Sequence, residues 1–116
     1  MNENYLRGNI VFGNYFWEFY NRQTNEVQGR IDWVIGLVRT LQIIPEKFFK
    51  HIEGTDRLYE IRIKVGRDIF RVFCCFDKGN LVKLFNGFQK KLNKTPKQEI
   101  ERAEKLNQLY FETKGL

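Results

Sequence analysis

The fold is decided by residues 58–96, which read LYEIRIKVGRDIFRVFCCFDKGNLVKLFNGFQKKLNKTP. Apolar, β-branched and aromatic residues dominate three short runs of this stretch, a composition that is typical of strands. The predicted strands are Leu58–Lys64, Ile69–Phe76 and Asn80–Phe88. Glycine-containing turns separate them, at residues 65–68 and 77–80, and such turns favour hairpins. The stretch therefore predicts a small, mainly antiparallel sheet.

Helical patterns precede this sheet. Apolar residues recur every three or four positions, which indicates an amphipathic helix, at Val27, Ile31, Val34, Val38 and Leu41. Thr24 is placed to cap the start of this helix. The aromatic run at residues 15–20 fits both a strand and a helix, and we interpret it as a short helix after an opening strand at Asn9–Phe12. Pro45 is expected to start a helical turn across Glu46–Lys50.

A further helix is predicted after the sheet. Thr95 and Pro96 are typical of a helix start, with Thr95 as the N-cap and Pro96 at the first helical position. This helix is expected to run to about Phe111 or Glu112. Helices before and after a run of hairpin-linked strands predict an α+β fold, in one domain that spans residues 1–116.

Positive charge is concentrated in one segment of the chain. Residues 57–97 hold eleven Lys or Arg and three acidic residues, a net of +8, whereas the rest holds nine basic and eleven acidic residues, a net of −2. The net charge of +6 therefore arises in the predicted sheet and its tail. Such a segment indicates a polyanionic partner, and nucleic acid, an acidic protein surface and an anionic membrane all fit the charge alone.

The cysteines indicate a cellular compartment. Cys74 and Cys75 are adjacent in a predicted strand, where neighbouring side chains point to opposite faces and do not readily bridge. Unpaired thiols are typical of a reducing environment. The first residues contain no apolar run of signal-peptide length, and no run approaches the roughly 20 apolar residues that span a bilayer. We expect a cytoplasmic protein without a membrane partner.

Basic residues of the predicted strands are the candidate site. Arg71 lies in an apolar strand, so its guanidinium must meet solvent, an acid or an anionic ligand, because unpaired burial would be costly. Two roles stay open for Arg71: an ion pair with Glu60 across the hairpin, and anion binding. The other candidates, each of which alone would be an ordinary exposed cation, are Arg62, Lys64, Lys90, Lys91 and Lys94. Their convergence where the third strand ends favours a phosphate site.

Residues that several enzyme classes require are missing from the sequence. His51 is the single histidine and is interpreted as a surface residue, so no Cys/His or Ser/His pair is recognisable. Metal-ligand spacings and a glycine-rich phosphate loop are absent, and no cofactor is expected. Phosphodiester chemistry here would therefore be metal-independent, with Arg and Lys supplying charge stabilisation and proton transfer.

Several motifs together resemble one known family. They are Leu58-Tyr59-Glu60-Ile61-Arg62, Phe70-Arg71-Val72-Phe73, Asn86-Gly87-Phe88-Gln89-Lys90-Lys91, Lys94-Thr95-Pro96 and Glu99-Ile100. In order and spacing, residues 58–100 resemble the HigB branch of the RelE/ParE toxin superfamily, which includes phage-derived proteins. The earlier residues fit more loosely. The resemblance implies a RelE-like fold, with N-terminal helices packed on the sheet and one C-terminal helix.

The resemblance also implies a function. Such proteins are toxins of type II toxin-antitoxin systems and act as mRNA interferases, endoribonucleases that cleave translated mRNA in the ribosomal A site. The ribose 2′-hydroxyl attacks the adjacent phosphate, and no metal takes part. The implied partners are mRNA on the ribosome and a HigA-like antitoxin with a helix-turn-helix domain.

Residue roles follow from the same resemblance. The implied catalytic residues are Arg71, Lys90, Lys91 and Arg62, and the implied substrate-binding residues are Lys64 and Lys94. Arg71 would stabilise charge on the phosphate in the transition state. Lys64 could act as the base only if its surroundings lowered its pKa, and Tyr110 is the nearest C-terminal alternative.

Two other functions stay open. ParE-type toxins share the fold and act on gyrase, so a non-catalytic binder, such as a gyrase inhibitor or a phage host-interaction protein, is the alternative. A chain that folds but has lost its activity is the third possibility. Arg71 and the adjacent lysines Lys90 and Lys91 favour the nuclease.

Overall fold

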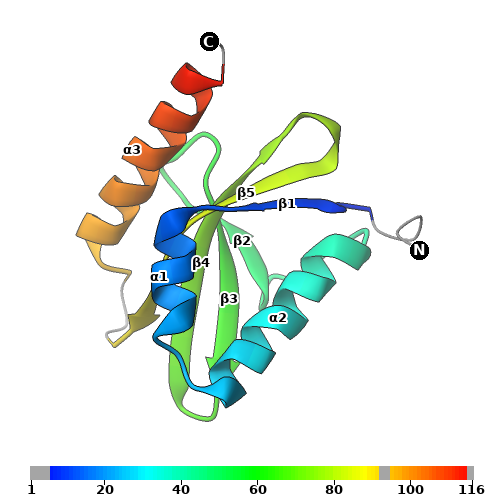
Figure 1. The fold of residues 1–116 in the computed structure, drawn as a ribbon, viewed down its shortest axis with the longest axis vertical. Coiled ribbons are helices and arrows are strands. Elements are labelled where there is room, and N and C mark those ends of the chain that lie inside the picture. The colour runs from blue at the N-terminus through cyan, green and yellow to red at the C-terminus, as the bar shows by residue number, and fades with distance from the viewer. Residues whose placement is uncertain (1–5, 92–94, 115–116) are drawn as a thin grey trace.

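The computed structural model describes residues 6–91 and 95–114, which form a five-stranded sheet and three α-helices (Figure 1). In chain order the elements are β1 Asn9–Phe12, α1 Asn14–Asn21, α2 Asn25–Thr40, β2 Phe49–His51, β3 Tyr59–Val65, β4 Asp68–Asp77, β5 Leu81–Lys90 and α3 Lys97–Thr113. A single 3-10 turn, η1 Lys78–Asn80, joins β4 to β5. The predicted α+β fold is confirmed.

The sheet has the strand order β1-β5-β4-β3-β2. Strand β1 runs parallel to β5, and all other neighbours in the sheet are antiparallel. Both predicted hairpins are present, and Gly66 and Gly79 adopt the left-handed backbone conformation in their turns, with φ of 60° and 68°. Glycine adopts this conformation without the steric cost that a side chain brings, which explains its place in each turn.

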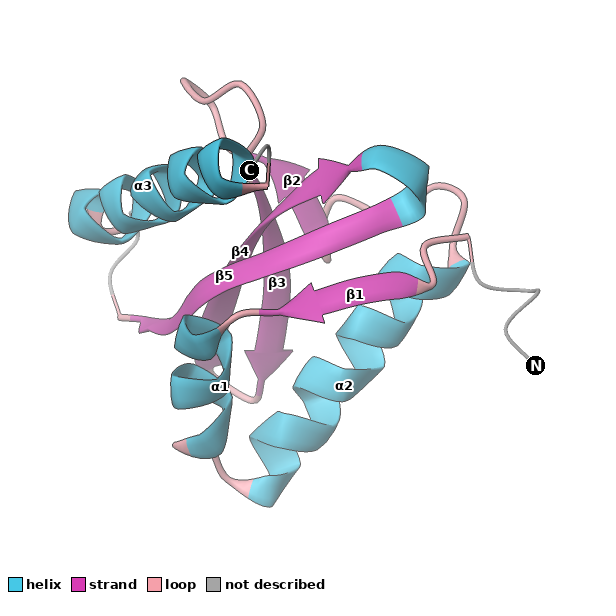
Figure 2. Cartoon of the chain, turned by 45° about the horizontal axis from the view of Figure 1, so that its top comes forward, coloured by secondary structure: helices cyan, strands magenta, loops and turns pink. Residues whose placement is uncertain are grey.

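The helices cover opposite faces of the sheet, as Figure 2 shows: α1 and α2 lie on one side and α3 on the other. Successive residues of β4 therefore enter two different cores. Val72 and Cys74 pack under α1 and α2, whereas Phe73 and Cys75 pack under α3. The prediction that the two cysteines point to opposite faces is confirmed, and both thiols are free and buried.

The N-terminal helices follow their sequence patterns. Thr24 caps α2 by accepting a hydrogen bond at its side-chain oxygen from the backbone N–H of Val27, at 3.2 Å. The predicted stripe is buried as far as Val38, but Leu41 lies beyond the helix in extended backbone. The ambiguous aromatic run is helical, because Phe16 and Phe19 then share one buried face.

Four local expectations need correction. The turn after Pro45 is short, and residues 49–51 pair with β3 as an edge strand that the sequence did not indicate. Strand β5 continues to Lys90, two residues beyond its predicted end at Phe88, so Gln89 and Lys90 belong to the sheet. Thr95 does not cap α3. Pro96 is the N-cap instead, because its ψ of 129° is extended and the helix begins at Lys97.

In the residues that the structure describes, no helix has the length and apolar character needed to cross a bilayer.

Candidate functional site

Strand register brings four predicted site residues to one face of the sheet. Arg62 lies directly opposite Arg71, and Lys64 lies opposite Ile69, which in turn lies opposite Lys90. Residues that face each other on neighbouring strands point to the same side of the sheet. We call Arg62, Lys64, Arg71 and Lys90 the basic cluster.

The basic cluster lies on the α3 side of the sheet but beyond the start of that helix. Phe73 and Phe88, whose ring centroids are 5.4 Å apart, belong to the core under α3 and adjoin the cluster. Asn86 fixes the start of α3, because its amide nitrogen donates to the carbonyl and the carboxylate of Glu99, at 3.1 and 3.0 Å. In the part of the chain that the structure describes, α3 therefore covers the core beside the cluster and not the cluster itself.

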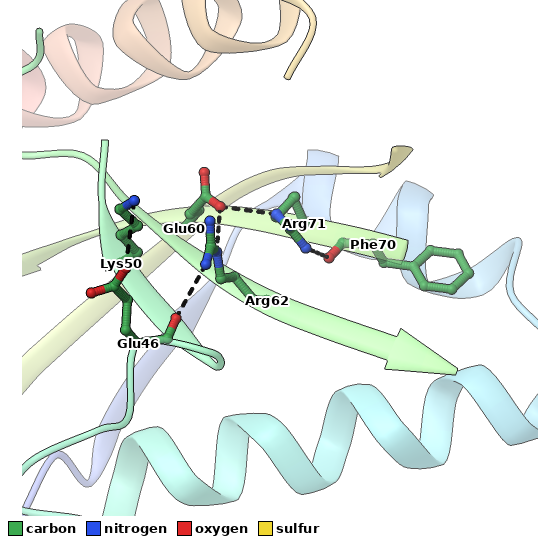
Figure 3. Close-up of polar contacts among 6 residues, drawn as sticks. All are labelled: Glu46, Lys50, Glu60, Arg62, Phe70 and Arg71. Atoms are coloured by element: carbon green, nitrogen blue, oxygen red, sulfur yellow. Dashed lines mark hydrogen bonds and ion pairs between the residues drawn. The ribbon is translucent and has the colours of Figure 1, made fainter. Parts of the chain in front are cut away.

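One carboxylate lies among these cations (Figure 3). Oε2 of Glu60 accepts a hydrogen bond from Nε of Arg62 at 2.8 Å and lies 2.9 Å from Nε of Arg71. The second contact is an ion pair whose N–H direction falls outside hydrogen-bond geometry. The Arg71–Glu60 pair that the sequence left open is thus present. It leaves the cluster with an excess of positive charge, because one carboxylate faces two guanidiniums.

The two arginines differ in their surroundings. Arg71 is only 8% exposed, and its Nη1 donates to the carbonyl of Phe70 at 3.1 Å. Arg62 is half-buried, and its Nη1 donates to the carbonyl of Glu46 at 3.4 Å. Burial lowers the pKa of Arg71 from its ordinary value, Arg62 adds to this, and Glu60 opposes it. Arginine nevertheless stays charged in proteins, so both side chains can stabilise an anion.

Lys90 is the last residue of β5 and shares the face of the cluster. Partial burial lowers the pKa of Lys90, and the positive charges of Arg71 and Arg62 lower it further, while Glu60 raises it. A lysine with a lowered pKa holds a larger fraction of neutral amine near neutral pH, which is the form that accepts a proton. The cluster therefore combines two guanidiniums with an amine whose pKa is lowered.

The remaining predicted site residues are less closely associated. Lys64 shares the face of the cluster but is exposed. Lys91 is exposed and follows the end of β5, outside the strand ladder. Lys94 lies outside the described residues.

Tyr110, the alternative proton-transfer residue, lies away from the basic cluster, against Asp77. Its hydroxyl donates to Oδ2 of Asp77 at 2.7 Å, and burial together with Asp77 raises its pKa to about 12. Asp77 ends β4 six residues after Arg71, which corresponds to roughly 20 Å of strand. His51 is exposed at the end of β2 against the ring of Tyr59, in agreement with its prediction as a surface residue.

Two features of the site were not predicted. Glu60 was considered only as a partner of Arg71, and its contact with both arginines depends on a strand register that sequence spacing does not provide. Lys50 lies opposite Glu60 on β2, so it shares the face of the cluster, and it pairs with Glu46 at 3.5 Å. Lys50 was missed because β2 was missed. Within the described residues, no group of three His, Cys, Asp or Glu side chains could hold a metal ion.

This fold and its basic face define a class, the RelE-type α+β domain. A solved structure of a mutant of the Escherichia coli toxin RelE in the free state matches with a TM-score of 0.63. The match covers 84% of this chain and 94% of that chain, at 13% sequence identity, so it concerns the fold.

The chain belongs to the family described as "Phage derived protein Gp49-like (DUF891)", whose model matches residues 18–108. No curated protein matches the chain. The predicted phage-derived family and the predicted RelE-like fold are therefore confirmed.

Proposed function

We propose that this chain is the toxin of a type II toxin-antitoxin system and that it cleaves mRNA on the ribosome as a metal-independent endoribonuclease. The observation that carries the proposal is the contact of Arg62 and Arg71 with one carboxylate beside Lys90. Cations held together on a partly open sheet face suit a phosphodiester, whose charge grows in the transition state.

The proposed reaction needs stabilisation of charge on the phosphate and transfer of two protons. The 2′-oxygen forms a bond to phosphorus while the bond from phosphorus to the 5′-oxygen breaks, which gives a 2′,3′-cyclic phosphate and a 5′-hydroxyl. Arg71 and Arg62 stabilise the extra negative charge on the phosphate oxygens. Lys90 as the neutral amine accepts the proton of the 2′-hydroxyl, and solvent supplies a proton to the 5′-oxygen.

The proposed function also implies contacts with RNA beyond the scissile phosphate and a partner protein. Lys64 and Lys91, both exposed near the end of the sheet, contact flanking phosphates of the message or of ribosomal RNA. Contacts of this kind make binding strongly dependent on salt. The partner that holds the toxin inactive is a HigA-like antitoxin with a helix-turn-helix domain, and the free toxin acts in the cytoplasm.

Mapping the 5′ ends of cellular mRNA after brief induction tests the proposal. We expect new ends inside translated regions, in phase with codons, which carry a 5′-hydroxyl and disappear when translation initiation is blocked. Growth arrest without new ends, together with inhibited DNA supercoiling, would refute the nuclease and support a non-catalytic, ParE-like gyrase inhibitor.

A further inference from the structure

Glu60 occupies an unusual position for a residue in a predicted anion site, because the residue is 8% exposed and its carboxylate lies between two guanidiniums. We propose that Glu60 is the positioning residue of the basic cluster. It orients Arg62 and Arg71 toward a phosphate. This inference rests on the proposed function and deepens it.

The contacts of Glu60 leave the outer ends of both arginines available. One oxygen, Oε2, lies within 2.9 Å of both Nε atoms, which are the nitrogens closest to each side-chain stem. Each Nη1 donates to a backbone carbonyl, of Phe70 or of Glu46. No hydrogen bond within the described residues takes up Nη2 of either arginine. Within the described residues, each guanidinium is therefore contacted at two of its three nitrogens, Nε and Nη1, which leaves Nη2 for an anionic ligand.

The charges favour this role over a purely structural ion pair. A buried pair is weak support for stability, because desolvation of both charges offsets most of their attraction. Here Arg62 and Arg71 are also directly opposed across two strands, an arrangement in which like charges repel. Glu60 offsets this repulsion only in part. The two guanidiniums and Glu60 together carry a net charge of +1, which the single negative charge of a phosphodiester would neutralise.

Glu60 also acts on Lys90 through its charge. The carboxylate raises the pKa of Lys90, in opposition to Arg71 and Arg62. Loss of the carboxylate charge should therefore lower the pKa of Lys90 and release its proton at a lower pH. A bound phosphate carries the same sign of charge as Glu60, so the two anions act in the same direction on Lys90.

The test compares Glu60→Gln with Glu101→Gln. Both variants remove one negative charge, but the Glu101 carboxylate is exposed on α3 and pairs with Lys97, not with the cluster. The Nε–H signals of Arg62 and Arg71 and the titration of Lys90 are followed by NMR, and cleavage is measured in a translation extract between pH 6 and 10. For Glu60→Gln we expect both arginine signals to shift, the Lys90 midpoint to fall, and kcat to drop by about tenfold or more with a smaller change in KM.

The outcomes separate the inference from the proposed function. If wild-type protein cleaves no mRNA, the nuclease proposal fails, and the NMR measurements alone decide the role of Glu60. Unchanged arginine signals and an unchanged Lys90 midpoint in folded Glu60→Gln would overturn the inference. Should Glu60→Gln unfold, Glu60→Asp keeps the charge on a shorter side chain: a retained Lys90 midpoint with reduced kcat supports positioning, and full activity refutes it.

Discussion

The ring of Phe19 in α1 lies directly against the backbone of Gly87 in β5. A methyl group added to Gly87 would come within 2.5 Å of Cδ2 of Phe19, closer than any van der Waals contact allows. The glycine in the Asn86-Gly87-Phe88 motif therefore permits close packing of helix on sheet, while Asn86 anchors α3 on the other side.

Replacement of Gly87 by alanine should destabilise the fold. Since Phe19 is buried and has little room to move, we expect overpacking to lower the free energy of unfolding by about 1–3 kcal/mol. The control is Gly29→Ala, because nothing lies within 4 Å of a methyl group there and alanine favours the helix. Urea unfolding of both variants checks this expectation. Equal stability of Gly87→Ala and wild type would contradict the packing described here.

Removal of Arg71 should abolish cleavage and leave the protein folded. Glu60 keeps its hydrogen bond to Arg62, so the buried carboxylate retains a partner in Arg71→Ala. We expect kcat to fall by about 10²–10³-fold, as for loss of a donor that stabilises transition-state charge. Arg67→Ala is the matched control, since Arg67 is exposed in the turn between β3 and β4. A folded Arg71→Ala protein that still cleaves mRNA at the wild-type rate would show that the site lies elsewhere.

Substitution of Lys90 by arginine should separate its charge from its proton transfer. Arginine preserves the positive charge but does not lose its proton near neutral pH. The pKa of Lys90 is lowered from 10.5, so wild-type kcat should increase with pH as the amine becomes neutral. In Lys90→Arg we expect this dependence to vanish and kcat to fall by about 10²-fold or more. The pH profiles of Lys90→Arg and of the control Lys105→Arg, at an exposed position of α3, check the expectation. A preserved profile in Lys90→Arg would rule out Lys90 as the base.

Asp77 should make stability depend on pH in the acid range. Hydrogen bonds from Lys114 and Tyr110, followed by the backbone N–H of Lys78, lower its pKa from 3.8 to about 2. A carboxyl group with a lowered pKa stabilises the fold above its unfolded value, and this contribution is lost as the pH falls from 3.8 toward 2. Thermal unfolding of wild type and Asp77→Asn across this range measures the effect. The difference in Tm should shrink as the pH falls, and a constant difference would exclude the linkage.

Local patterns were sufficient to predict the main elements. The apolar stripe of α2 and the turn glycines act over a few residues, so they are visible in the sequence. Strand β2 has three residues and depends on pairing with β3, which no local pattern records. Thr95 matched a cap motif, but the backbone of Pro96 places the helix start one residue later.

The candidate site was predicted less completely because it depends on register. Arg62, Arg71 and Lys90 were named from their charge, yet only strand pairing shows that they share one face. The role of Glu60 requires the positions of two side chains on different strands. Tyr110 was named because it lies in the predicted C-terminal helix. That helix, α3, carries Tyr110 away from the cluster, toward the far end of β4.

The adjacent thiols of β4 lie in different cores, so each can report on the opening of one core. Cys74 reports on the core under α1 and α2, and Cys75 on the core under α3. Burial raises the pKa of both thiols, so neither reacts readily while its own layer is closed. Thiol labelling of Cys74→Ala and Cys75→Ala proteins would time the opening of each layer separately. A partner that lifts α3 alone would thus leave a chemical mark on one residue and spare its neighbour.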